Sequence, residues 1–274
     1  MADCKILFCD LDATLLDDQK NIEKGTRAAI DEMLAQGHIF AICTGRPLAS
    51  AKKVADRYGL NGKGCYVVAY NGGVIYQPDN DTIISYTSIP LPVVHQMFDR
   101  AEEAGLYIHT YDRTDTVVTL RHTPEVDAYL GHTKLTAKTG ADAVAGLLDE
   151  PAKMIVISMD DNQALKAFQE HNAAWAKDKL NSFFSCEQYL EYCPAGISKG
   201  AGVVNLCRHL GIPVELSVSA GDERNDVSMI KAAGLGAVPA NAHREAAACS
   251  DYICSLDNNQ GAVGEIIRKF ILSK

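Results

Sequence analysis

The sequence predicts an α/β protein built on a parallel sheet, with a second domain of α+β type inserted into it. Three observations support this fold class. Short apolar strands alternate with helices over residues 5–70, and the same alternation returns over 199–271. The stretch between them follows a different pattern. Regular alternation favours parallel strands, because each parallel pair needs a crossover connection that is usually a helix.

The alternation starts with the apolar run 5–9, which ends at Asp10 and is typical of a strand buried on both faces. Apolar residues at helical spacing predict a helix over 26–36, followed by Gly37 at the position of a C-terminal stop. The next predicted elements are a strand over 39–43, a helix over 49–58 and a strand over 66–70.

The closing part of the chain repeats this order from Lys199 onward. Strands are predicted over 216–220, 236–239 and 252–255, and helices over 199–209, 227–233, 243–249 and 263–271. Both ends of the chain therefore contribute to one Rossmann-like parallel sheet.

The middle of the chain carries strands in pairs and then strands that alternate with helices. The strand-like stretches are 83–89, 107–111, 116–120 and 154–159, and the helical ones are 93–104, 141–148 and 162–174. We therefore expect a discontinuous core of residues 1–81 and 196–274, with an inserted α+β domain over 82–195.

Composition and charge argue against several classes of function and several cellular locations. The chain has 26 Lys and Arg against 35 Asp and Glu, a net charge of −9, which argues against nucleic-acid binding. No stretch approaches the roughly 20 apolar residues of a membrane span, and the N-terminus lacks a secretion-signal pattern. Nine cysteines with no C-x-x-C indicate buried thiols in a reducing compartment. We expect a cytoplasmic monomer or homodimer, without nucleic-acid or membrane partners.

Polar residues follow each predicted core strand where it ends. In open α/β sheets, ligands bind outside the carboxyl ends of the strands, so these residues should meet at one edge. They are Asp10-Leu11-Asp12, Thr44-Gly45-Arg46, Asn71-Gly72 and Gly221-Asp222-Glu223-Arg224-Asn225-Asp226, with Lys199 opening the helix before the last strand.

The four carboxylates Asp10, Asp12, Asp222 and Asp226 would repel one another in a shared pocket unless a cation binds. Ligands that are all oxygen suit a hard ion such as Mg²⁺, which also bridges to phosphate. One carboxylate can attack phosphorus, and a second carboxylate can act as general acid and then base. Residues i and i+2 of an extended strand face the same way, so the first two acids can both face the site.

Together, these motifs resemble the haloacid dehalogenase superfamily, and within it the Cof-type phosphatases with a C2B-type α/β cap. The similarity runs from Asp10 through the inserted segment to 221–226, with the motifs in family order. The resemblance implies a Mg²⁺-dependent phosphatase that hydrolyses small phosphate monoesters, with sugar phosphates the expected class, through an aspartyl-phosphate intermediate. The inserted segment would be a cap that closes over the leaving group.

The resemblance also implies a role for each motif residue. Asp10 would be nucleophile and metal ligand, Asp12 the acid/base with its backbone carbonyl on the metal, and Asp222 and Asp226 further metal ligands. The phosphoryl group would be held by Thr44, Gly45, Lys199 and Asn225. The part of the site that receives the rest of the substrate would be shaped by Arg46, Asn71 and Gly72. In the inserted segment, Tyr111, Arg113 and Arg121 are candidates for contacting the substrate.

Ala13 departs from the family pattern, which has glycine after the second aspartate. Alanine would be strained there if the position needs a positive φ. We expect ordinary backbone at Ala13, because every other motif residue is present.

Two alternatives remain open from the sequence. One is a phosphotransferase or phosphomutase of the same superfamily, which passes the phosphoryl group to a hydroxyl instead of water. The other is a non-catalytic regulator that retains the fold, although an intact acid/base at Asp12 speaks against it.

Overall fold

A computed structural model describes residues 4–273, apart from the side chain of His132. The chain divides into two compact units. The core unit lies within Met1–Arg46, Ala51–Ser85 and Ser198–Lys274, and the inserted unit within Pro47–Ser50 and Tyr86–Ile197. Within the described part of the chain, no helix is both long and apolar enough to cross a bilayer.

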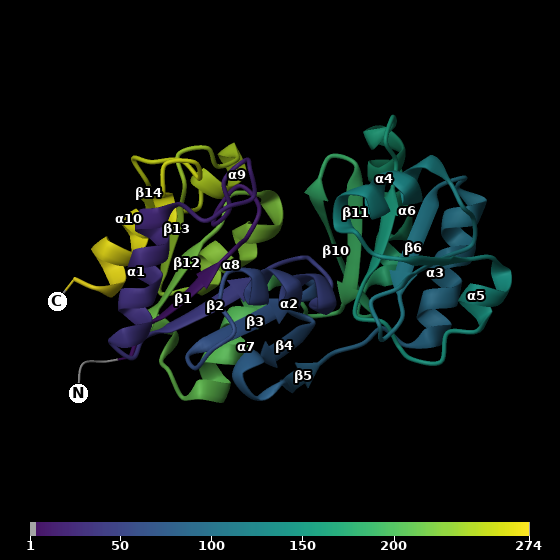
Figure 1. The fold of residues 1–274 in the computed structure, drawn as a ribbon. Helices are drawn as coiled ribbons and strands as arrows, with labels where there is room; N and C mark the ends of the chain where they lie inside the picture. The colour runs from purple at the N-terminus through teal and green to yellow at the C-terminus, as the bar shows by residue number, and fades with distance from the viewer. Residues whose placement is uncertain (1–3, 274) are drawn as a thin grey trace. The chain divides into compact units, whose positions relative to one another are not determined.

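The core unit is built on an eight-stranded sheet in the order β14-β13-β12-β1-β2-β3-β4-β5 (Figure 1). The strands are β1 (Ile6–Cys9), β2 (Ile39–Cys43), β3 (Cys65–Ala69), β4 (Val74–Gln77), β5 (Thr82–Tyr86), β12 (Ser217–Ala220), β13 (Leu235–Val238) and β14 (Tyr252–Ile253). The pairs from β14 to β3 are parallel, and β4 runs antiparallel to β3. All four residues of β1 are fully buried, because β1 pairs with both β2 and β12 near the centre of the sheet.

Helices cover this sheet, as parallel crossovers require. They are α1 (Lys24–Ala35), α2 (Leu48–Arg57), α7 (Lys199–Leu210), α8 (Val227–Ala232), α9 (Arg244–Ala247) and α10 (Ala262–Ile266), which continues into a π-helical turn over Ile267–Ile271. Phe8 and Val68 of the sheet pack with Val203 and Leu206 of α7 and Met229 of α8 in one apolar cluster. Helices α1 and α10 contact each other.

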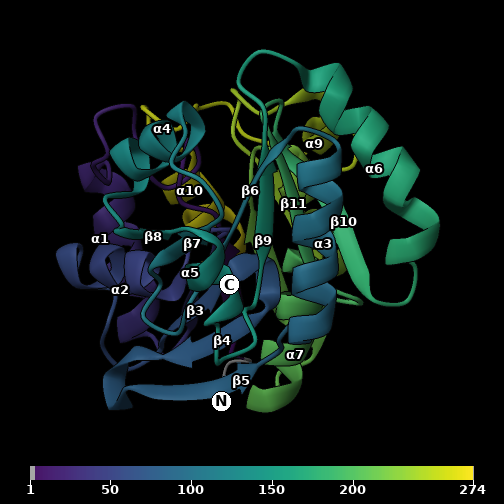
Figure 2. The same cartoon turned by 90° about the vertical axis from the view of Figure 1, so that its right-hand side faces the viewer.

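The inserted unit has its own six-stranded sheet, in the order β10-β11-β9-β6-β7-β8. Its strands are β6 (Tyr107–Tyr111), β7 (Val117–Thr119), β8 (Ala137–Thr139), β9 (Met154–Ile157), β10 (Leu180–Cys186) and β11 (Tyr189–Pro194). Its helices are α3 (Leu91–Glu103), α4 (Pro124–Thr133), α5 (Ala141–Ala145) and α6 (Asn162–Ala176) (Figure 2). The pairs are antiparallel except β7 with β8.

Alternating residues of the inserted sheet point to two different environments. Ile108 and Val156 join an apolar cluster with α3 and α6. His109, the next residue after Ile108, lies on the opposite face. It is fully buried, its Nε2 lies 3.1 Å from the Tyr111 hydroxyl, and that hydroxyl bonds to the hydroxyl of Tyr129.

A buried ion pair accompanies this cluster of rings. Lys153 Nζ lies 3.0 Å from Glu191 Oε2, and both side chains are almost fully buried. Burial, and then the positive charge of Lys153, lower the pKa of His109 to about 3. The imidazole is therefore neutral in the folded protein at neutral pH.

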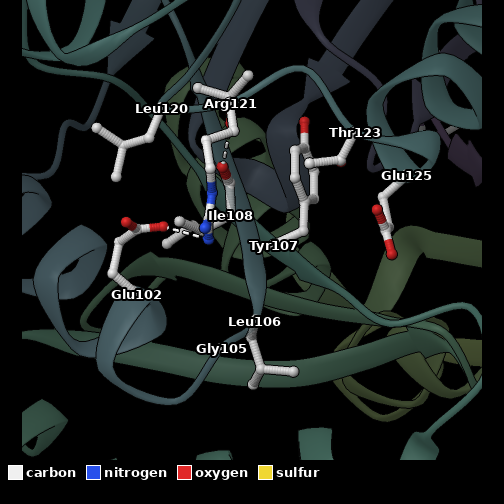
Figure 3. A pocket seen from close by; sticks show the side chains of 10 residues that line it. Glu102, Gly105, Leu106, Tyr107, Ile108, Leu120, Arg121, Thr123 and Glu125 are labelled. Atoms are coloured by element: carbon white, nitrogen blue, oxygen red, sulfur yellow. Dashed lines mark hydrogen bonds and ion pairs between the residues drawn. The ribbon is translucent and has the colours of Figure 1, made fainter.

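The inserted unit also contains a cavity of about 100 Å³ at the start of β6 and the end of β7 (Figure 3). Arg121, a candidate for substrate contact, pairs here with Glu102 at 2.5 Å. Within the described part of the chain, the buried hydroxyl of Thr123 has no hydrogen-bond partner. The cavity is polar and large enough for ordered water. Arg113, another candidate, is exposed and pairs with Asp149 at 2.9 Å.

The predicted fold class is confirmed. The structure adds β4, β8, β10, β11 and α4, none of which is among the elements predicted above. Most of β10 (Leu180–Cys186) is only partly buried, so its sequence mixes polar and apolar residues without clear alternation. The strand predicted over 252–255 has only two residues, because pairing with β13 ends at Ile253.

Replacing His109 by glutamine tests the burial of a neutral imidazole. The pKa of a free histidine is about 6.5, so only the unfolded chain takes up this proton as the pH falls towards 3. His109 should therefore lower the free energy of unfolding by about 2 kcal/mol between pH 7 and pH 5. Urea unfolding at both pH values should show a weaker pH dependence in His109→Gln. Equal pH dependence in both proteins would contradict this.

Candidate active site

Three buried acids meet at the carboxyl ends of the central strands of the core unit. Asp10 follows β1, and its backbone N–H continues the parallel ladder by donating to the Ala220 carbonyl at 2.9 Å. Asp222 and Asp226 follow β12. One carboxylate oxygen from each acid lies within 4.8 Å of the others, and all three residues are buried.

Lys199 links two of these acids. Its Nζ lies 2.6 Å from Asp10 Oδ1 and 2.6 Å from Asp226 Oδ1, and its side chain is 1% exposed. Lys199 is the first residue of α7, and the Ser198 side chain caps that helix by accepting from Ala201 N–H at 3.1 Å. The start of α7 thus fixes where the ammonium group enters the site.

Backbone groups hold Asp226 in place. Its Oδ2 accepts hydrogen bonds from the N–H groups of Asp222 and Glu223, both at 3.0 Å. A Cβ at Gly221 would lie 2.6 Å from both Cβ and Cγ of Asp226. The glycine at 221 is therefore needed so that this carboxylate can fold back against its own loop.

The cluster contains three acids but only one ammonium group, that of Lys199. Burial raises the pKa of Asp10 to about 7, with Lys199 opposing and Asp226 adding to the rise. Burial, and then Asp10 and Asp226, raise the pKa of Asp222 to about 8. Burial alone would lower the pKa of Lys199, but Asp10 and Asp226 raise it well above its usual value. Three close acids whose mutual repulsion favours proton uptake fit a hard divalent cation, which would balance their charge in place of the protons.

The carboxylate of Asp12 makes a separate set of contacts. Arg46 donates to it from Nε at 3.0 Å and from Nη2 at 2.7 Å, and Lys20 donates from Nζ at 2.8 Å. The Asp12 side chain is 37% exposed. Burial alone would raise its pKa, but Arg46 and Lys20 outweigh burial and lower it. Asp12 is therefore ionised at neutral pH.

Arg46 was predicted to contact the substrate, but in the structure it pairs with Asp12, the predicted acid/base. Lys20 is a contact that the sequence reasoning missed. It stands eight residues after Asp12 in a loop, and no motif or periodicity marks it.

The residues after β2 and β3 form a connected group. Asn71 N–H donates to the Thr44 carbonyl at 3.0 Å, and the Thr44 hydroxyl accepts from Arg46 N–H at 3.2 Å. Asn225 Nδ2 lies 3.4 Å from Asn71 Oδ1. A Cβ at Gly45 would lie 3.0 Å from the same Asn71 oxygen. The structure therefore brings these predicted residues together.

Gly72 has a structural requirement of its own. Its φ is +99°, and a Cβ there would lie 2.3 Å from the Ser198 carbonyl oxygen. Asn71 also has a positive φ, and the two residues lie in the short 3₁₀ turn (Tyr70–Gly72) that joins β3 to the antiparallel β4. Asn-Gly is a favoured sequence for turns between antiparallel strands, because both residues tolerate a positive φ.

The backbone at Ala13 is not ordinary, so the expectation for this residue was wrong. Its φ is +58°, in the left-handed region that favours glycine. The chain turns sharply after Asp12, and Leu16 N–H closes the turn on the Leu11 carbonyl at 2.8 Å. An alanine in this conformation costs about 1–2 kcal/mol. The glycine of the family pattern was the signal that this position needs a positive φ.

Replacing Ala13 by glycine should raise the free energy of unfolding by about 0.5–1 kcal/mol. The left-handed conformation costs glycine little, and the greater freedom of glycine in the unfolded chain offsets part of that gain. Denaturant unfolding measures the change. The matched control is Ala28→Gly, at an exposed position inside α1, which should lower stability by about 0.5–1 kcal/mol. A loss of stability in Ala13→Gly similar to that of the control would contradict the strain.

Comparison with known proteins identifies the family. Residues 7–267 match the family model described as haloacid dehalogenase-like hydrolase. The 5-amino-6-(5-phospho-D-ribitylamino)uracil phosphatase YitU of Bacillus subtilis (strain 168) is 27% identical over 239 residues, 86% of each chain.

Solved structures agree with this. A haloacid dehalogenase-like hydrolase from Bacteroides thetaiotaomicron superposes with a TM-score of 0.86 at 28% identity, covering 97% of this chain and 99% of that one. The subclass IIB sugar phosphatase BT4131 shares the fold, with a TM-score of 0.81 at 20% identity, covering 97% and 98% of the two chains. The resemblance predicted from the motifs is confirmed: the chain is an enzyme that belongs to the haloacid dehalogenase-like hydrolases.

Proposed function

We propose that this enzyme is a Mg²⁺-dependent phosphatase that hydrolyses small phosphate monoesters, with sugar phosphates as the expected class. The observation that carries the proposal is the position of Asp10, at the end of β1, with Lys199 Nζ at 2.6 Å and two further buried acids beside it. A carboxylate next to a fixed ammonium group can attack phosphorus while the cation stabilises the phosphoryl oxygens. The names of the phosphatase relatives support the same substrate group.

The carboxylates of Asp10, Asp222 and Asp226 would hold the ion, with the backbone carbonyl of Asp12 as a further proposed ligand. When bound, Mg²⁺ neutralises negative charge in the site and orients the phosphate for attack.

In the first step, the Asp10 carboxylate forms a bond to phosphorus, and the bond from phosphorus to the ester oxygen breaks. The leaving oxygen takes a proton from Asp12, which acts as general acid. The Thr44 hydroxyl and the Lys199 ammonium group hold the phosphoryl oxygens, with Asn225 beside them. Lys199 stays charged throughout, because Asp10 and Asp226 raise its pKa well above the usual value.

In the second step, Asp12 accepts a proton from water. That water attacks phosphorus, the bond to Asp10 breaks, and inorganic phosphate leaves. The contacts of Asp12 with Arg46 and Lys20 favour its ionised form, as this step needs. The first step needs the protonated form, so we propose that Arg46 moves from Asp12 to the substrate when substrate binds.

We further propose that residues 82–195 act as the substrate-selecting cap of a catalytic core formed by 1–81 and 196–274. Small phosphorylated metabolites in the cytoplasm would be the substrates, and the enzyme would work as a monomer or homodimer. The proposal rests on the division into two units, each with its own sheet.

Replacing Asp10 by asparagine should lower phosphate release by at least about 10³-fold, because the nucleophile is lost. The readout is inorganic phosphate released from a panel of phosphorylated metabolites with Mg²⁺, alongside a thermal unfolding curve. Asp31→Asn, at an exposed position of α1, is the matched control and should keep full activity. Normal turnover in Asp10→Asn would overturn the proposal. Transfer to a sugar hydroxyl without free phosphate would make the enzyme a phosphotransferase.

A chelator should abolish phosphate release, and added Mg²⁺ should restore it. Mg²⁺ should also raise the melting temperature without substrate, because the ion relieves repulsion among the three acids. Asp222→Asn should weaken Mg²⁺ binding, so that this shift needs a roughly 10- to 100-fold higher concentration. An identical Mg²⁺ dependence of the melting temperature in both proteins would exclude Asp222 as a ligand.

A further inference from the structure

The loop that carries Asp12 is tied to two later loops of the core unit by asparagine side chains. Asn241, in the loop after β13, donates from Nδ2 to the Ala13 carbonyl at 2.9 Å. Asn258, in the loop after β14, donates from Nδ2 to the Leu16 carbonyl at 3.1 Å. Both carbonyls belong to the turn that begins immediately after Asp12.

The two asparagines are also joined to each other. Asn241 Oδ1 accepts from the backbone N–H of Asn258 at 3.0 Å. Both partners of the Asn241 amide are backbone groups, one acceptor and one donor, so only one orientation of the amide satisfies them. Asn258 is 4% exposed, which makes it a fixed anchor for the chain.

The hydrogen bond from Asn241 to the Ala13 carbonyl stabilises a residue whose backbone is strained. Alanine at a φ of +58° is less stable than in the ordinary basins, so the turn holds only if its surroundings stabilise it. The Asn241 amide donates its hydrogen bond to the carbonyl of this strained residue. Residue 13 follows Asp12 directly, so any relaxation of its backbone moves the Asp12 peptide and, with it, the carboxylate.

We propose that Asn241 is a positioning residue for the reaction: it holds Ala13 in its left-handed conformation and thereby keeps Asp12 oriented towards the substrate. This inference rests on the proposed function. It assigns the orientation of the acid/base to a residue far from it in sequence, whose described side-chain hydrogen bonds join it to the backbone at Ala13 and Asn258.

The test is a double-mutant cycle of Asn241→Ala and Ala13→Gly. In the unmodified background, Asn241→Ala should lower kcat roughly 10- to 100-fold and leave KM within about twofold, because orientation and not binding is lost. In the Ala13→Gly background, the same change should lower kcat only about twofold, since glycine adopts a positive φ without help. Equal losses in the two backgrounds, or no loss in either, would overturn the inference.

Two further variants separate positioning from general damage to the loop. Asn241→Asp keeps the acceptor for Asn258 N–H but loses the donor to Ala13, so it should behave like Asn241→Ala. Asn259→Ala removes contacts with Asp18 and with the side chain of its neighbour Asn258, and should keep normal kcat. A loss in Asn259→Ala equal to that in Asn241→Ala would assign the effect to the whole loop and reject a specific role for Asn241.

Hydrogen exchange gives a readout that needs no catalysis. The amide of Leu16 bonds to the Leu11 carbonyl across the turn. Its exchange should be roughly tenfold faster in Asn241→Ala than in the unmodified protein, because the turn opens more often. Unchanged exchange would overturn the inference. If the unmodified protein releases no phosphate, the proposed function fails, and exchange alone still decides whether Asn241 holds the turn.

Discussion

Lys199 reaches Asp10 and Asp226 from the first turn of α7, in a site where none of the three side chains has much access to water. Charges buried in this way are stable only when paired, and removing one partner leaves the others uncompensated. One ammonium group faces three acids, so the acids can be ionised together only when a further cation balances their charge. Much of the surrounding structure serves to hold this arrangement, from the cap at Ser198 to the close approach that only glycine permits at Gly221.

The acids divide into two kinds of environment, and the division follows from their partners. Asp10 and Asp222 lie in the buried cluster, where burial and mutual repulsion raise their pKa values to about 7 and about 8. Asp12 lies nearer to solvent with Arg46 and Lys20, which lower its pKa. A bound divalent cation would favour the ionised form of Asp10, which attack on phosphorus requires, whereas Asp12 is kept ionised by its own basic partners. The two environments are only two residues apart in the sequence, because Asp10 contacts Lys199 whereas Asp12 contacts Arg46 and Lys20.

The sequence predicted the parts of this enzyme that depend on local pattern. Apolar runs such as Ile6–Cys9 identified the central strands, and the parallel order placed Asp10, Thr44 and Asp222 at one edge of the sheet. Contacts between distant loops could not be predicted in the same way. Nothing local distinguishes Lys20 or Asn241 from other polar loop residues, since their partners are set by tertiary folding. Ala13 shows a third case: its backbone lies in a left-handed turn, whereas ordinary backbone was expected there because every other motif residue is present.

The order of strands in the core sheet has a consequence for the synthesis of the chain. β1 is synthesised before the inserted unit, but its neighbour on one side, β12, follows that unit in the sequence. While the ribosome makes residues 86–197, one edge of β1 and the apolar face that α7 later covers remain open. The inserted unit has its own sheet and apolar cluster, so it can fold during that interval. The core sheet can therefore close only after the whole inserted unit has been synthesised, when β12 becomes available to pair with β1.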